Sequence, residues 1–252
     1  MTDVFDALRR MGLRAPREAL DALLVHAAKG KLSPTQMLED LVALEQRERD
    51  ARNLARRAKL ATLGSAAPID RFDWNHPRTI DRDLYNQLLN LDFLRRGDNV
   101  LFRGPAGVGK TTLAKALGMR ALEKGHTVLF STLPAALADL LRQESIPATE
   151  RRLRRYVRPD LLILDELGYV PCDSRAADLF FHIVSRRHEA RSIVVTTNLG
   201  FKAWSTAFKD ASCLGALVDR FAQHCHTMDI DAESWRQKSS LKRSARTARQ
   251  DD

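Results

Sequence analysis

Cysteine is scarce in this sequence. The cysteines are odd in number and scattered, with no Cys-x-x-Cys pair: Cys172, Cys213 and Cys225. This usage argues against a disulfide framework or a zinc site, and it suits a reducing compartment. His224 and His226 flank one of the cysteines, but neighbours on a strand point to opposite faces, so we expect no metal site there.

Long apolar runs are also missing. No stretch reaches the roughly 18 consecutive apolar residues of a membrane-spanning helix. The segment Met-Thr-Asp-Val-Phe-Asp at the N-terminus lacks the basic-then-apolar pattern of a secretory signal peptide. We therefore expect a cytoplasmic protein with no membrane partner.

Positive charge is plentiful: the formal net charge is +9. A basic chain favours a polyanionic partner, although a generally basic enzyme would have the same total. The distribution is more informative, because two clusters contain no acid. The first is Arg151, Arg152, Arg154, Arg155 and Arg158, and the second is Arg236, Lys238, Lys242, Arg243, Arg246 and Arg249. We predict that the first cluster binds the phosphates of double-stranded DNA; the alternative is a solvated helix face.

The chain is predicted to have two domains. Residues 1–60 carry apolar side chains at helical spacing and predict about three helices, with Ser33 capping a helix that begins at Pro34. We interpret this region as a domain that binds a partner or DNA. Residues 61–79 contain Gly64, Pro68 and Pro77 and predict a linker. Residues 80–240 form the second domain, and residues 241–252 predict a basic, flexible tail.

The second domain alternates helical segments with short buried strands. The strand candidates are residues 100–103, 127–131, 161–164, 192–197 and 226–230. Such alternation predicts an α/β fold, with a parallel sheet between helices.

A phosphate-binding loop lies between the first strand and the helix that follows it. Residues 104–111 read Gly-Pro-Ala-Gly-Val-Gly-Lys-Thr, a full match to G-x-x-x-x-G-K-[ST]. Backbone N–H groups and the helix N-terminus would face ATP phosphates, Lys110 would reach the β- and γ-phosphates, and Thr111 would bind Mg²⁺. The alternative is an ordinary glycine-rich turn. The predicted ATP contacts are Gly104, Pro105, Ala106, Gly107, Val108, Gly109, Lys110, Thr111 and Thr112.

Two acids end the apolar strand at residues 161–164. Asp165 is predicted to hold Mg²⁺ with Thr111, and Glu166 to act as the general base on the attacking water. The alternative is a buried strand followed by a helix-capping acid.

Two further polar residues complete the predicted catalytic set. Asn198 follows the strand at residues 192–197 and could orient the water, or it could simply form a turn before Gly200. Arg220 suits an arginine finger, because its guanidinium is always charged; the alternative is a surface ion pair with Asp219 or another acid.

Together these motifs resemble the AAA+ ATPases of the IstB/DnaC group, the ATP-binding helpers of insertion-sequence transposition and the related helicase loaders. The resemblance rests on residues 104–111, on Leu-Leu-Ile-Leu-Asp-Glu-Leu-Gly at 161–168, Thr-Thr-Asn-Leu at 196–199, Leu-Val-Asp-Arg-Phe at 217–221 and Glu-Ser-Trp-Arg at 233–236. It implies a P-loop AAA+ core, with Asn198 as sensor 1 and Arg220 as the finger.

The resemblance also implies a function. The family assembles on DNA as a homo-oligomer with ATP at subunit interfaces, and it recruits or stimulates a partner transposase. The first alternative is a DnaC-like replicative helicase loader. The second is a P-loop kinase, but the Asp165–Glu166 pair, Asn198 and Arg220 fit water as the nucleophile better.

Overall fold

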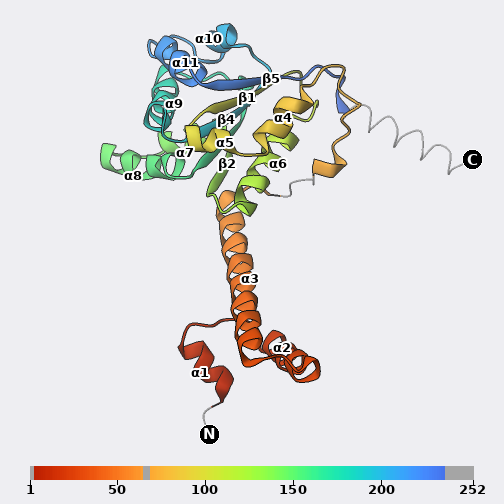
Figure 1. The fold of residues 1–252 in the computed structure, drawn as a ribbon. Helices are drawn as coiled ribbons and strands as arrows, with labels where there is room; N and C mark the ends of the chain where they lie inside the picture. Colours follow the sequence, from red (N-terminus) through yellow and green to blue (C-terminus); the bar gives the residue numbers. More distant parts are fainter. Residues whose placement is uncertain (1–2, 65–68, 236–252) are drawn as a thin grey trace, which may run out of the picture. The chain divides into compact units, whose positions relative to one another are not determined.

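The computed structural model describes residues 3–64 and 69–235 (Figure 1). The basic cluster at residues 236–249 and the predicted tail at residues 241–252 lie outside the described residues. Contacts divide the chain into two compact units that meet between Lys59 and Leu60. Over the described ranges, none of the helices has the length and apolar character needed to cross a membrane.

The first unit is helical. Its helices are α1 (Val4–Arg10), α2 (Arg17–Gly30) and α3 (Pro34–Ala61). The Ser33 hydroxyl accepts a hydrogen bond from the Gln36 N–H, and the Gln36 side chain accepts one from the Ser33 N–H, at 3.3 and 3.0 Å. This reciprocal cap satisfies backbone donors at the first turn of α3 and explains why the helix begins at Pro34.

The second unit is built on a parallel sheet. Its strands are β1 (Asn99–Arg103), β2 (Val128–Thr132), β3 (Leu161–Leu167), β4 (Ser192–Thr197) and β5 (Cys225–Asp229), in the order β2-β3-β4-β1-β5. The strands lie where the apolar runs predicted them, which confirms the α/β fold with a parallel sheet between helices.

Helices and short turns connect these strands. The longer helices are α6 (Lys110–Glu123), α7 (Leu133–Leu141), α8 (Ile146–Val157), α9 (Ser174–Arg187) and α11 (Leu214–Ala222). The shorter ones are α4 (Arg82–Leu88), α5 (Asp92–Arg96) and α10 (Trp204–Ala207), with 3₁₀ turns at Ile69–Arg71 and Phe201–Ala203.

Helices cover both faces of the sheet. Leu162 and Leu164 of β3 belong to the buried cluster formed with α7 and α9, whereas Ile163 points the other way and lies against Gly118 of α6. Alternate residues of a strand face opposite sides, so α6 packs on one face and α7 and α9 pack on the other (Figure 1). The carboxyl ends of the strands then meet at one edge, where open α/β sheets bind ligands.

Arg187, at the end of α9, is fully buried and links three elements. Its guanidinium donates to backbone carbonyls in the last turn of α8, just after that helix and at the start of β4, at 2.6–3.1 Å: Tyr156, Val157, Pro159, Asp160 and Ser192. These hydrogen bonds are buried or partly buried, so the arginine satisfies acceptors that burial would otherwise leave unpaired.

Candidate nucleotide-binding site

The phosphate-binding loop joins β1 to α6 at the carboxyl edge of the sheet. Gly107 and Gly109 have φ of +79° and +101°, which side-chain-bearing residues rarely adopt. A Cβ atom at Gly107 would also clash with the Ser234 side chain, and one at Gly109 with the Phe72 ring. The loop therefore requires glycine at both positions, for conformation and for space.

Lys110 is the first residue of α6 and is only 6% exposed. Its ammonium donates to the carbonyl oxygens of Gly104 and Pro105, at 2.7 and 2.6 Å. The charge is therefore held inside the loop, where the N–H groups of the first turn of α6 also point. This is the arrangement that binds phosphate at a helix N-terminus.

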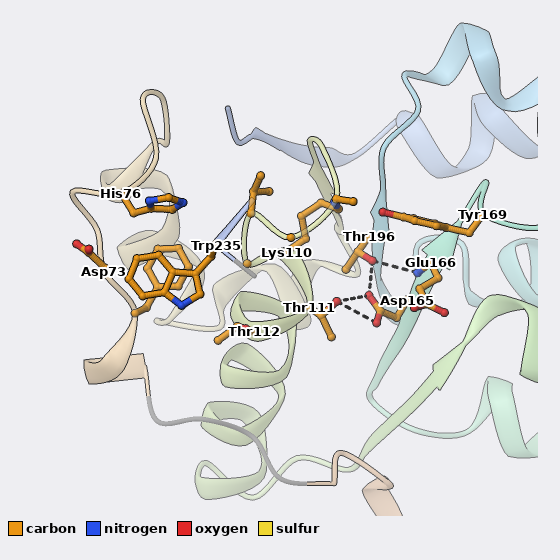
Figure 2. A pocket seen from close by; sticks show the side chains of 15 residues that line it. Asp73, His76, Lys110, Thr111, Thr112, Asp165, Glu166, Tyr169, Thr196 and Trp235 are labelled. Carbon is orange, nitrogen blue, oxygen red and sulfur yellow. Dashed lines mark hydrogen bonds between the residues drawn. The ribbon is translucent and has the colours of Figure 1, made fainter. Parts of the chain in front are cut away.

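Asp165 is the centre of a hydrogen-bonded chain that crosses three elements (Figure 2). The Thr111 hydroxyl donates to the Asp165 carboxylate at 2.9 and 3.0 Å, and the Thr196 hydroxyl donates to the same carboxylate. The Glu166 N–H donates to the Thr196 hydroxyl at 3.1 Å. Asp165 is only 4% exposed, so these donors offset the cost of burying its charge.

An irregularity in β3 separates the two acids. Its register against β4 shifts between Leu164 and Leu167, and Glu166 has a φ of +68°. The bulge buries Asp165 beside Thr111 and leaves Glu166 exposed at the cavity. Such a conformation is costly for glutamate and is found where a site requires it.

The cavity has a volume of about 290 Å³ and extends well beyond the predicted contacts. It is lined by Phe72, Asp73, His76, Ala106, Gly107, Val108, Gly109, Lys110, Thr111, Thr112, Asp165, Glu166, Tyr169, Thr196 and Trp235. Every residue of the predicted loop except Gly104 and Pro105 is present, together with both acids. Sequence reasoning missed Thr196, Tyr169 and the aromatic end of the cavity.

The aromatic end joins two distant segments. The rings of His76 and Trp235 meet edge to face, with centroids 4.8 Å apart, and the His76 Nε2 lies 2.9 Å from the Glu233 carbonyl oxygen (Figure 2). The backbone N–H of Trp235 donates to the Gly107 carbonyl at 3.0 Å. The segment that we expected to be a linker therefore contributes to the cavity, and aromatic rings are the usual lining for a planar base.

The donor set at the acidic end fits Mg²⁺. A hydroxyl and a carboxylate lie side by side at Thr111 and Asp165, and hard oxygen ligands of this kind suit that ion. Across residues 3–64 and 69–235, no group of three or more His, Cys, Asp or Glu side chains gathers to hold a metal ion. A bound Mg²⁺ would thus need phosphate oxygens and water to complete its coordination, as nucleotide sites provide.

The structure does not bring Asn198 or Arg220 into this cavity. Asn198 lines a neighbouring cavity beside Gly104 and Pro105, where Arg103 and Asp229 form a bidentate ion pair at 2.5 Å. Arg220 lies on α11 and is not among the residues that line either cavity. It has no carboxylate partner within the described part of the chain, so the expected alternative of an ion pair with Asp219 is absent there.

The predicted DNA-binding arginines lie on α8 and, for Arg158, at its C-cap, and they are not equivalent. Four are exposed: Arg151, Arg154, Arg155 and Arg158. Arg152 instead forms a bidentate ion pair with Asp139 at 2.6 and 2.7 Å, and Tyr156 donates to the same carboxylate at 2.6 Å. Arg155 pairs with that carboxylate only at 4.0 Å and stays exposed. Partial burial would raise the pKa of Asp139, but these hydrogen bonds and the nearby charges outweigh it and hold that pKa below its usual range.

Known proteins resemble this chain over most of its length. A family model described as IstB-like ATP binding protein matches residues 6–243. The chain is 38% identical over 223 residues to an ATP-binding protein of insertion sequence IS21 from Pseudomonas aeruginosa, covering 88% of this chain and 84% of that protein. It is 32% identical to the corresponding protein of insertion sequence IS5376 from Geobacillus stearothermophilus, covering 92% and 93% of the two chains.

A solved structure also matches. The crystal structure of the DnaC helicase loader aligns with a TM-score of 0.50 and 20% identity, over 63% of this chain and 98% of that one. At that identity the likeness concerns the AAA+ fold alone. The family model and the two relatives cover more of this chain than the solved structure does. With the phosphate-binding loop, they show that the chain belongs to the family of IstB-like ATP-binding proteins.

Proposed function

We propose that this protein is an ATPase that assembles on double-stranded DNA and helps a partner transposase in insertion-sequence transposition. One observation carries the proposal: the Thr111–Asp165–Thr196–Glu166 chain beside a complete phosphate-binding loop. Family membership supports the biological setting, because the relatives are named for insertion sequences.

ATP would occupy the cavity from end to end. Its phosphates would contact the loop and Lys110, and its base would lie near His76 and Trp235. A bound Mg²⁺, held by Thr111 and Asp165, would supply positive charge to the β- and γ-phosphates.

The reaction proposed is hydrolysis. The water oxygen forms a bond to the γ-phosphorus, the bond from that phosphorus to ADP breaks, and Glu166 accepts the water proton. Glu166 is suited to this role because the bulge in β3 leaves its carboxylate exposed at the cavity. Asn198 is proposed to orient the attacking water. It lines the neighbouring cavity, on the side of the phosphate-binding loop formed by Gly104 and Pro105.

Arg220 is proposed to act on ATP bound by a neighbouring copy. The absence of Arg220 from the lining of its own cavity supports an action across an interface. ATP would then lie between subunits, and assembly of the homo-oligomer would depend on nucleotide because the γ-phosphate contacts both copies.

DNA would be held by the exposed arginines of α8. These are four of the five arginines in the first basic cluster. Contacts between arginine and phosphate carry little sequence information, so binding would be largely independent of DNA sequence.

Two measurements test the proposal. We expect phosphate release from ATP to rise when double-stranded DNA is added, with no phosphorylated small molecule formed, which also separates this activity from that of a kinase. We expect purified transposase to be retained on DNA only when this protein and ATP are both present. Retention of a replicative helicase but no transposase would favour the helicase-loader alternative and overturn the assignment.

A further inference from the structure

The surroundings of Arg220 on its own chain are specific. Its guanidinium donates to the Ser185 hydroxyl at 2.5 Å, and its Cζ atom lies 4.8 Å from the centre of the Phe181 ring. Phe181 and Ser185 are one turn apart on α9, so they present a ring and a hydroxyl on the same face of that helix. Contact between α9 and α11 therefore sets where the charged group lies.

The arrangement leaves most of the guanidinium available. An arginine has five N–H donors in a planar fork, and only Nη1 is used by Ser185. No other hydrogen-bond acceptor for Arg220 occurs among residues 3–64 and 69–235. A ring face and one hydroxyl thus restrict a long side chain without neutralising its charge or consuming the donors that a phosphate would need.

We propose that Phe181 and Ser185 are positioning residues that hold Arg220 oriented for the γ-phosphate of ATP bound by a neighbouring copy. This inference rests on the proposed ATPase function and on Arg220 as its finger. A finger that is already ordered loses less conformational freedom when it meets the phosphate, so the rate of hydrolysis rises while ATP binding is unaffected.

The packing between α9 and α11 does not depend on these two side chains alone. Phe180 of α9 and Leu217 and Phe221 of α11 are fully buried in the core, whereas Phe181 and Ser185 are only partly buried. Phe181 also packs against that core, so its contact with Arg220 has to be separated from its contribution to the fold by a matched control and by mixed assemblies.

The first test separates hydrolysis from binding. Phe181→Leu keeps apolar bulk but removes the ring face, and we expect kcat to fall about tenfold with KM for ATP unchanged. Ser185→Ala should act in the same direction, and Phe181→Tyr, which keeps a ring, should retain most of the activity. Phe201→Leu is the matched control, because Phe201 is a partly buried ring that contacts Trp204 and Phe221 rather than Arg220.

The decisive test uses mixed assemblies. Lys110→Ala subunits offer a finger without an ATP site, and Arg220→Ala subunits offer an ATP site without a finger, so their mixture should recover activity. Adding Phe181→Leu to the Lys110→Ala subunits should lower that recovered activity about tenfold, whereas adding it to the Arg220→Ala subunits should leave it unchanged.

The outcomes separate the inference from the function on which it rests. Equal loss from either placement would mean that Phe181 supports the fold only, and no loss from either would mean that it does not act on Arg220; both overturn the positioning role. If the parent mixture recovers no activity, the finger across the interface is itself wrong, and the positioning role fails with it.

Discussion

The hydroxyl of Thr196 joins the two acids of the site. It donates to the buried Asp165 carboxylate and accepts the Glu166 N–H, at the position where β3 departs from regular pairing with β4. A positive φ at Glu166 has to be stabilised by its surroundings, and this hydrogen bond is one of the contacts that do so.

Removing that hydroxyl should slow hydrolysis without unfolding the protein. Thr196→Val keeps the shape of the side chain but leaves Asp165 with one donor fewer and the Glu166 N–H without its acceptor. We expect kcat for ATP hydrolysis to fall about ten- to a hundredfold, with ATP affinity nearly unchanged. Steady-state kinetics with a fluorescent-nucleotide titration would measure both, and Thr196→Ser should restore the rate. A valine variant with wild-type kcat would remove Thr196 from the mechanism.

Only some residues of the cavity could be predicted from the sequence. Lys110 and Thr111 follow from a motif whose spacing is set by the chemistry of phosphate binding, and the two acids follow from their position at the end of an apolar strand. Thr196 is one residue in an apolar strand, and only the pairing of β3 with β4 places it beside Asp165. Trp235 reaches the cavity through contacts with residues more than 100 positions away, such as Gly107, which no local pattern contains.

At the level of elements, Arg187 holds the end of α8 to the start of β4. Replacing it by methionine would leave several buried carbonyls without donors, so we expect the free energy of unfolding to fall by on the order of 3 kcal/mol. Chemical denaturation would measure the loss. Arg186→Met is the matched control: that arginine pairs with Glu150 near the surface, and its loss should cost at most about 1 kcal/mol. Equal effects of the two variants would contradict the role of the buried contacts.

The exposed face of α8 and its C-cap carries four arginines. By helical geometry, Arg151, Arg154, Arg155 and Arg158 lie within an arc of about 100°, while Arg152 points toward Asp139. The sequence predicted five equivalent DNA-binding arginines. Because Arg152 is held by Asp139, a test of DNA binding should replace only the other four.

Replacing these four arginines by alanine should weaken DNA binding to unrelated duplexes alike. Each lost phosphate contact lowers the slope of log affinity against log salt by about 0.9, so the slope should fall by up to about 3.6. The measurement is affinity for two duplexes of different sequence across a salt series, with ATP present. A variant with Lys124, Arg175, Lys202 and Lys209 replaced has the same change in net charge and should keep the steeper slope. If both variants behave alike, α8 is only a solvated face.

The elements themselves were largely predictable, and their irregularities were not. Each strand is a short apolar run, and burial on both faces of a parallel sheet requires such runs. The bulge at Glu166 has no such signature, because its sequence continues the strand with ordinary residues. Residues 61–79 were expected to be a linker because Gly64, Pro68 and Pro77 interrupt them, yet in the described part of that segment Phe72 packs beside Gly109 and His76 beside Trp235.

At the scale of the whole molecule, the site is assembled from both ends of the second unit. Arg78 and Thr79 pair with Asp231 through backbone hydrogen bonds of 2.7–3.2 Å, and the chain then continues to Trp235 at the loop. The segment before the sheet and the segment after it are therefore fastened together where the nucleotide would lie. A nucleotide in the cavity would contact both segments at once, which suits the proposed dependence of assembly on ATP.

Two variants should have opposite effects on that assembly. Lys110→Ala removes the cation of the phosphate-binding loop, so ATP-dependent assembly on DNA should be lost. Glu166→Gln preserves the shape of the site but cannot accept the water proton, so ATP should bind and remain intact, and the assembly should persist for many times longer than the wild-type one. Sedimentation with labelled DNA, followed over time after excess ATP is removed, would measure both. Glu123→Gln is the matched control, because it makes the same chemical change on α6, outside the cavity lining, and should dissociate like the wild type. A Glu166→Gln protein that hydrolyses ATP at the wild-type rate would show that Glu166 is not the base, and one that fails to hydrolyse ATP yet releases DNA as quickly as the wild type would show that hydrolysis does not time release.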